Sequence, residues 1–197
     1  MIIPSLIIFV AFTFEAIFGW GGGLISIPLL SLLLPISDSV SLVLFFQLSL
    51  GLLFIKHLNL QFVKVNLFFI FFLVIGTIIG TLTLFAFNDE ILKKILGIFI
   101  LVYLVKDLFF SNIKVPINYL SKVIVGFFGG VFQGQLGCGG PPISIYFSSL
   151  NLSKSDFRIS MILSLLIACM IRMILTFVSL PFTKDFLVIY YFQYHYF

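Results

Sequence analysis

Long apolar stretches, separated by short polar turns, set the pattern along this chain. A helix needs about 20 apolar residues to cross a lipid bilayer, and most of these stretches approach that length. Two of the apolar pieces, residues 24–34 and 142–150, are too short to cross alone. We therefore predict membrane-embedded helices over residues 2–18, 39–55, 65–87, 91–108, 123–136 and 157–180. The pattern predicts a further helix beginning at residue 186.

Short polar segments predict where these helices begin and how two of them pack. Residues 35–38 form a turn, in which Ser37 or Asp38 is suited to cap the next helix. A basic loop at residues 56–64 precedes the helix at 65–87. That helix carries a face of small residues, which predicts close packing against a neighbour: Gly76, Thr77, Gly80 and Thr81.

A glycine-rich break interrupts the apolar pattern twice. The first begins at Gly19 and reads Gly-Trp-Gly-Gly-Gly, and the second begins at Gly137 and reads Gly-Cys-Gly-Gly-Pro-Pro. Neither glycine nor proline continues a helix well, and lipid offers no partner for the freed backbone groups. We therefore expect both breaks to lie inside the protein, where such paired interruptions mark the binding site of a transporter.

The two breaks belong to a longer internal repeat. A shift of about 118 residues, longer than most repeat periods, aligns the glycines of both breaks and also pairs Asp38 with Asp156. The fold class predicted is an all-α polytopic membrane protein with two homologous repeats, each opening with a Gly/Pro-broken helical hairpin. Residues 1–110 form the first membrane repeat, 111–121 a linker, and 122–197 a second membrane repeat that we expect to be truncated at its C-terminus.

Composition excludes a soluble globule. The chain of 197 residues is 61% hydrophobic and 9% charged, whereas a soluble domain carries roughly a quarter charged residues. The net charge of +4 is spread over loops, so it concerns orientation in the membrane rather than nucleic acid. No nucleotide-binding loop, cofactor motif or metal-ligand spacing is present in the sequence, so we expect neither an enzyme nor a cofactor-dependent or metal-dependent protein.

Lysine and arginine positions favour one orientation. If each broken segment is a hairpin that returns to the side it left, most basic residues share one side, and the N-terminus lies outside. An odd number of crossings then separates the two repeats, so they are inverted. If each broken segment crosses once instead, Lys154 and Arg158 change sides and the charge bias weakens.

Glu15 is the most informative single residue. It lies about one helical turn before Gly19, inside an apolar helix. A carboxylate there is costly unless it is protonated or paired, and such residues are usually functional. We predict a proton-coupling role, with a neutral, hydrogen-bonded structural glutamate as the alternative.

Arg172 is an ionisable residue that lies well inside the predicted span 157–180. A stripe at four-residue spacing places it on the helix face that should point away from lipid: Ser160, Ser164, Ala168, Arg172 and Thr176. A buried guanidinium suits a bidentate oxyanion such as a sulfonate or carboxylate. A salt bridge to Glu15, or snorkelling to the surface, is the alternative.

The breaks themselves supply backbone N–H groups at the starts of two short helices, and such ends attract anions. The glycines could instead serve only close helix crossing, but the repeat duplicates turn and proline together, which favours a site. Gln47, Gln135 and Ser144 could add polar lining or join helices. The predicted substrate-binding residues are Gly19, Gly21, Gly22, Gly23, Gly137, Gly139, Gly140, Pro141, Gln133 and Arg172.

With both breaks, Pro28, the basic loop and the Gly76/Gly80 helix in view, the chain resembles the sulfite exporter TauE/SafE family of membrane permeases. The resemblance covers nearly the whole chain. It implies a multi-span transporter of small sulfur-containing anions such as sulfite or organosulfonates, in the bacterial inner membrane and driven by a gradient rather than ATP. The partners expected are the lipid bilayer and a small inorganic or organic anion, with a homo-oligomer possible.

Two other readings stay open. An intramembrane thiol-redox protein would use Cys138 and Cys169, whose Cα atoms would then have to lie within about 7 Å of each other. The repeat duplicates neither cysteine. The unmatched residues 80–110 of the first half leave open an inactive or truncated transporter subunit.

Overall fold

The computed structural model describes residues 2–57, 67–109, 116 and 118–179, and within these all regular structure is helical. The short turn η1 (Ile55–His57) follows the third helix. The α-helices are α1 (Ile2–Phe18), α2 (Gly22–Leu30), α3 (Ile36–Phe54), α5 (Leu67–Ala86), α6 (Asp89–Phe109), α7 (Tyr119–Leu136), α8 (Gly140–Ser148) and α9 (Lys154–Ser179).

The predicted helices and short apolar pieces correspond to these elements in order, and the boundaries differ most at the end of α2, which is Leu30 rather than residue 34, and at the start of α7. This helix begins at Tyr119 rather than at residue 123. The side chain of Asn118 accepts the backbone N–H of Ser121 at 2.8 Å, and the Ser121 hydroxyl accepts the backbone N–H of Asn118 at 3.2 Å. This capping box satisfies free N–H groups and starts the helix early. The predicted loop at 58–64 and the helix from 186 lie outside the described residues.

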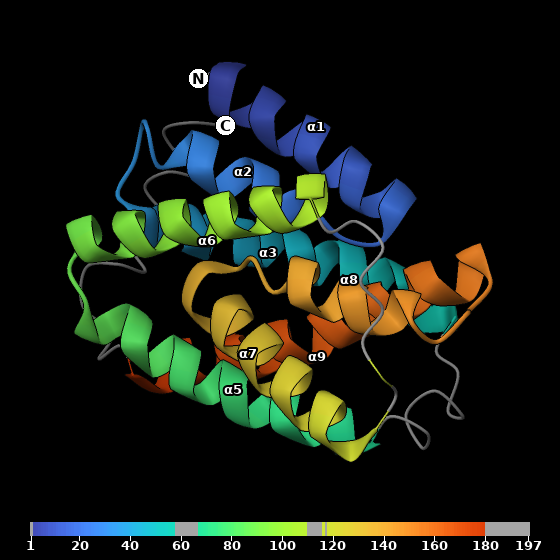
Figure 1. The fold of residues 1–197 in the computed structure, drawn as a ribbon. Coiled ribbons are helices and arrows are strands. Elements are labelled where there is room, and N and C mark those ends of the chain that lie inside the picture. Colours follow the sequence, from blue (N-terminus) through green and yellow to red (C-terminus); the bar gives the residue numbers. More distant parts are fainter. Residues whose placement is uncertain (1, 58–66, 110–115, 117, 180–197) are drawn as a thin grey trace.

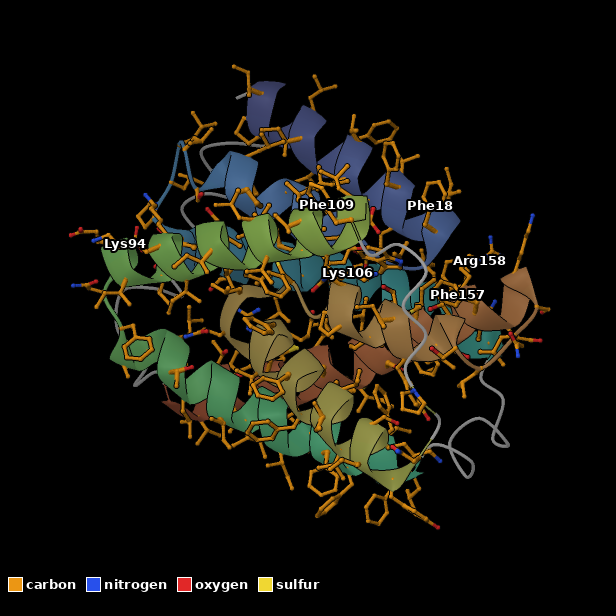
Figure 2. The ribbon with its side chains drawn as sticks, viewed as in Figure 1. Phe18, Lys94, Lys106, Phe109, Phe157 and Arg158 are labelled. Atoms are coloured by element: carbon orange, nitrogen blue, oxygen red, sulfur yellow. The ribbon has the colours of Figure 1, made fainter. Side chains whose placement is uncertain are left out.

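Among the described residues, three helices are long and apolar enough to cross a membrane, namely Ile36–Phe54, Leu67–Ala86 and Lys154–Val178, and Ile3–Phe18 is a shorter apolar helix. Large apolar side chains point outward from the bundle, as Phe18 and Phe109 do (Figure 2). These two are 56% and 75% exposed, which suits contact with lipid tails rather than water. The protein is therefore an α-helical membrane protein. The α6 helix is not among the three, so its crossing stays a prediction.

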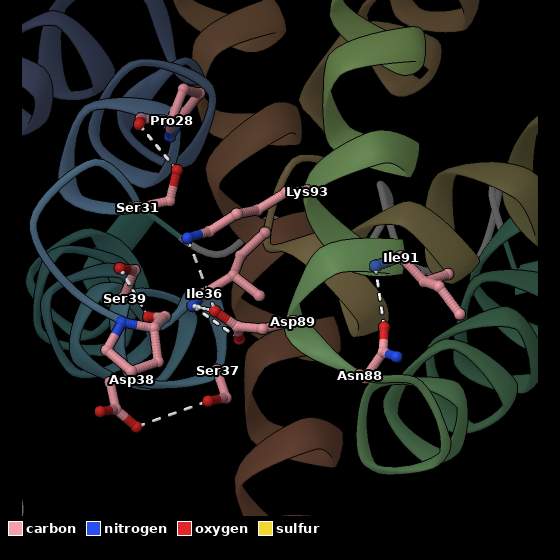
Figure 3. A network of polar contacts seen from close by, with 11 residues as sticks. Pro28, Ser31, Ile36, Ser37, Asp38, Ser39, Asn88, Asp89, Ile91 and Lys93 are labelled. Atoms are coloured by element: carbon pink, nitrogen blue, oxygen red, sulfur yellow. Dashed lines mark hydrogen bonds and ion pairs between the residues drawn. The ribbon is translucent and has the colours of Figure 1, made fainter.

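The predicted cap on α3 is wrong. The helix begins at Ile36, and neither Ser37 nor Asp38 caps it. The backbone N–H of Ile36 instead donates to both carboxylate oxygens of Asp89, at 3.0 and 3.1 Å, and Lys93 lies 3.6 Å from the same carboxylate (Figure 3). A charge from the first turn of α6 thus satisfies the start of α3, where the helix dipole favours an anion.

We expect Asp89→Ala to destabilise the protein by about 1 kcal/mol, since loss of a helix cap typically costs that much. Asp89→Asn keeps an accepting oxygen and should retain most of the stability. The measurement is thermal unfolding of the purified protein in one detergent. Glu90→Ala is the matched control, because it removes only the exposed pair between Glu90 and Lys94 and should change stability by less than about 0.5 kcal/mol. Equal losses in the two alanine variants would contradict the capping role.

Helices from the two sequence halves interleave in space. The pair α5 and α7 packs most extensively, and α3 packs along α9, so each predicted half contacts the other (Figure 1). One apolar cluster joins α1, α2, α3 and α6 and also includes Leu84 of α5, Leu136 of α7 and Cys138, and a second joins α5, α8 and α9. A small third cluster between α3 and α9 connects these two clusters. Cys138 of the second break belongs to the first cluster and Trp20 of the first break packs against the second, so both breaks lie where these two clusters meet.

Candidate functional site between the two glycine-rich breaks

Each break is a short turn that reverses the chain. Between α1 and α2, Gly19 and Gly21 have φ angles of 90° and 115°, and after α7, Gly137 has a φ of 64°. Residues other than glycine rarely adopt these backbone angles, so the sequence must supply glycine there. The short helices α2 and α8 then double back against α1 and α7 (Figure 1). Both breaks therefore begin hairpins, as the sequence pattern predicts.

The two breaks touch each other, and glycine makes this contact possible. A Cβ atom added to Gly23 would overlap the carbonyl oxygen of Gly137, and one added to Gly140 would lie 2.9 Å from the ring of Trp20. Backbone cannot move aside cheaply in such a contact. The structure thus brings together two segments that are far apart in the sequence.

A small cavity lies at this junction. Its walls come from both breaks, from Gln47 of α3 and from Leu165 of α9. Its interior has room for about one water molecule, which is smaller than a sulfur oxyanion. The other lining residues are Trp20, Gly21, Gly23, Leu24, Gln133, Gly137, Cys138, Gly140 and Pro141.

A chain of amides connects the breaks across this cavity. The backbone N–H of Gly139 donates to Oε1 of Gln133 at 2.9 Å, and Nε2 of Gln133 donates to Oε1 of Gln47 at 3.0 Å. The amide of Gln47 makes a longer contact, 3.5 Å, with the carbonyl oxygen of Gly137. The thiol of Cys169 also donates to Oε1 of Gln47, at 3.3 Å. Four separate segments of the chain are held by this one network.

Glu15 lies on the first-break side of the network and is only 2% exposed. Its carboxyl group interacts with the backbone N–H groups of Gly22 and Gly23 and with the side-chain amide of Gln47. A Cβ atom on Gly22 would overlap this carboxyl group, so glycine is needed for its position. Its Oε2 atom has no close hydrogen-bond partner among the described residues. The carboxyl group is therefore buried with spare accepting capacity.

Arg172 lies on the second-break side and is 1% exposed, so it does not snorkel to the surface. Its Nη1 atom lies 3.5 Å from the position that a Cβ of Gly137 would take. Neither Nε nor Nη1 donates a hydrogen bond to any described residue, and within the described helices no ion pair joins Arg172 to Glu15. A buried guanidinium with two unsatisfied nitrogens is costly, which points to a ligand or ion that normally binds them.

The rest of the predicted stripe on α9 is mainly buried, as expected: Ser160, Ser164 and Ala168 are at most 5% exposed. Four predicted site residues do not line the cavity in this structure, because Gly19 packs against Arg158, Gly22 against Glu15, Gly139 against Gly129 and Gln133, and Arg172 lies behind Gly137. The six that do line it are Gly21, Gly23, Gly137, Gly140, Pro141 and Gln133.

Residues that the sequence pattern did not single out also line the cavity. Leu24 and Leu165 are apolar positions in apolar helices, and nothing in the pattern separates them from lipid-facing leucines. Trp20 could have been noticed, because it is the single tryptophan and lies within a break. Gln135 and Ser144, considered as lining, are buried elsewhere.

The two cysteine thiols have separate partners. Cys138 bonds the carbonyl of Leu136 at 3.3 Å, and Cys169 bonds Gln47 and Gln133. Both thiols are free and buried. This geometry gives the thiol-redox alternative no support.

Comparison with protein families gives one match that covers almost the whole chain. The model described as Sulfite exporter TauE/SafE matches residues 5–192, which include both breaks and the cavity. Comparison with curated proteins and with solved structures gives no match. On the strength of the family match, the chain belongs to the sulfite exporter TauE/SafE family.

Proposed function

We propose that this protein is a secondary transporter, a permease that moves small sulfur-containing anions such as sulfite or organosulfonates across a membrane. Family membership supports the class of substrate, and the apolar helices support the location in a bilayer. The ten residues predicted for substrate binding belong to this proposal as a shell around the junction of the two breaks.

The observation that carries the proposal is the buried guanidinium of Arg172 behind Gly137, whose Nε and Nη1 atoms have no hydrogen-bond partner among the described residues. Gly137 forms part of the cavity wall, so a small displacement of this turn would expose Nη1 to an occupant. A guanidinium binds the oxygens of sulfite or a sulfonate in a bidentate manner. The N-terminal ends of α2 and α8, which also face the junction, would add partial positive charge.

The cavity must enlarge to admit such an anion, because it holds only about one water molecule in this structure. We infer that the structure represents a closed state and that the hairpins α1–α2 and α7–α8 move apart in transport. Movement of two inverted repeats around a fixed site is a common basis of alternating access.

Three likenesses between the hairpins support an internal repeat. The short helices α2 and α8 each have nine residues, and Gly19 and Gly137, which the repeat pairs, both have positive φ. Their serines also correspond, because Ser26 donates to the carbonyl of Gly22 at 2.5 Å and Ser144 to that of Pro141 at 2.8 Å.

We further propose a location in the bacterial inner membrane with the N-terminus outside. The charges support this orientation. Lys94 lies at one end of α6, while Lys106 lies toward the other end, on the side where Arg158 is found (Figure 2). This separation matches the hairpin arrangement of the breaks, in which Lys106 and Arg158 share the cytoplasmic side.

The experiment is uptake of radiolabelled sulfite into proteoliposomes, with and without a proton gradient, using the whole chain. We expect protein-dependent uptake that competes with unlabelled sulfonates. Glu15→Gln should make uptake independent of the proton gradient, because an amide cannot carry the proton that a buried carboxyl group can. The expected loss of gradient stimulation is about tenfold or more.

Gln135→Met is the matched control, since this buried amide neither lines the cavity nor contacts Glu15 in any described interaction. It should keep the gradient stimulation of the parent protein. Folded parent protein that takes up neither sulfite nor a sulfonate would refute the proposed function. Unchanged gradient stimulation in Glu15→Gln would refute the coupling role alone.

A further inference from the structure

One series of hydrogen bonds runs across the junction from the second break toward the first, and a weaker contact runs the other way, from Nε2 of Gln47 to the carbonyl oxygen of Gly137 at 3.5 Å. The N–H of Gly139 donates to Gln133, Gln133 donates to Gln47, and the amide of Gln47 reaches the carboxyl group of Glu15. In this series each donor lies toward the second break and each acceptor toward the first. Aligned hydrogen bonds polarise one another, and the last acceptor determines the strength of the series.

An ionised carboxylate is a much stronger acceptor than a neutral carboxyl group, and hydrogen bonds to charged groups are roughly twice as strong. When Glu15 is ionised, the amide chain is drawn toward the first break and holds Gly139 with it. When Glu15 takes up a proton, the pull on Gln47 falls and the link to the second break weakens.

From this geometry we propose that Gln47 and Gln133 form a latch between the two breaks, closed by the ionised carboxyl group of Glu15 and loosened when that group is protonated. The latch gives the coupling step of the proposed transport function a physical path from proton to cavity. Both glutamines are positioning residues, since they act through Glu15 and the breaks. Its geometry does not depend on which anion is carried.

Few other charged groups could replace Glu15 as the acceptor that closes the latch. The helices that pack most against α1 are α2 and α3, whose charged residue in the described structure is Asp38, and Arg158 of α9 packs against Gly19 just beyond the end of α1. The remaining ionisable groups that interact electrostatically around Glu15 are Cys138 and Cys169, and Arg172 interacts with both thiols. Of these, Cys169 also contacts Gln47 directly, so a thiol-to-hydroxyl change must be among the controls.

Gln47 is placed to connect both breaks at once. It is 4% exposed and comes from α3, which belongs to neither hairpin. Its Nε2 atom lies 3.2 Å from the position that a Cβ of Gly23 would take, and the same atom makes the long contact with Gly137. A long hydrogen bond is weak and is easily lost when the amide shifts.

Alkylation of Cys138 tests the latch without any transport assay. Cys138 lines the cavity and is 2% exposed, so it reacts with N-ethylmaleimide only when the breaks separate. The labelling rate is measured by mass spectrometry on the whole reconstituted protein, at one pH, with Cys138 and Cys169 quantified separately. We expect Glu15→Gln and Gln47→Met each to raise the rate at Cys138 about tenfold, and the double variant to add little more.

Gln135→Met and Cys169→Ser are the controls, and both should label Cys138 at the parent rate. If Gln47→Met does not fold, Gln47→Asn replaces it, because an amide one methylene shorter cannot span the same distance. Parent-like labelling in Glu15→Gln, or additive increases in the double variant, would overturn the latch. If the Cys138 labelling rates change as expected but the protein transports no sulfite, the proposed substrate is wrong and the latch stands.

Discussion

Replacing Arg172 by glutamine is expected to weaken sulfite binding about 100-fold, since removal of one partner from a buried charge pair costs several kcal/mol. The guanidinium is 1% exposed and its Nε and Nη1 atoms have no partner among the described residues. It therefore has free donors to offer an oxyanion. Arg172→Lys keeps the charge but loses the planar fork, and an intermediate loss of about tenfold is expected.

The measurement is equilibrium binding of labelled sulfite to purified protein in detergent. Arg158→Gln is the matched control, because Arg158 lies on the same helix, with its guanidinium 5.7 Å from the ring centre of Phe54 and away from the cavity. This control should bind sulfite within about threefold of the parent protein. Equal losses in the two glutamine variants would show that Arg172 acts only through the general positive charge of α9.

Stability separates a binding role from a structural one. A buried charge without a partner destabilises the protein, so Arg172→Gln should leave the anion-free protein as stable as the parent or more stable. Added sulfite should raise the unfolding temperature of the parent and not that of the variant. A clear loss of stability in the anion-free variant would mean that Arg172 serves the fold and would count against the anion site.

The sequence predicted the site best where chemistry is local. Consecutive glycines inside an apolar run predict a break, and the positive φ angles at Gly19, Gly21 and Gly137 confirm the physical reason. Spacing along one helix was equally informative. The four-residue stripe through Arg172 predicted burial, which depends only on helical geometry once one face is known to avoid lipid.

Contacts between distant segments could not be predicted in the same way. The cap of α3 comes from Asp89, which is 53 residues beyond Ile36, and a local pattern favours the nearer Ser37 or Asp38. The partner of Gln133 is similar, because Gln47 lies 86 residues away on α3 and only the tertiary packing of the helices brings the two side chains together. Side-chain direction across a helix interface is set by tertiary packing.

The small face predicted on α5 was correct, and it supports the largest expected effect on stability. Gly76, Thr77, Gly80 and Thr81 are all buried there. A Cβ added to Gly80 would overlap the carbonyl oxygen of Val131 on α7, and in return one added to Gly130 would overlap that of Leu73. The two backbones are in direct contact through glycines on both helices.

Gly130→Ala is expected to destabilise the protein by about 3 kcal/mol or more, which corresponds to a fall of roughly 10 °C in Tm. The added methyl group would also lie 2.8 Å from the backbone nitrogen of Thr77, and neither backbone can move without separating α5 from α7. Because α7 leads directly into the second break, its displacement should also disturb the cavity. Thermal unfolding and size-exclusion chromatography in one detergent provide the measurement.

Gly97→Ala is the matched control for this effect. Gly97 lies within α6, is exposed, and has no atom within 4 Å of an added Cβ. The same substitution should therefore be neutral or stabilising by about 0.5–1 kcal/mol, because alanine favours the helix over glycine. If Gly130→Ala unfolds at the same temperature as Gly97→Ala, the backbone contact between α5 and α7 cannot be as close as the structure has it. If it unfolds far lower, the close contact between α5 and α7, the helix that leads into the second break, is confirmed.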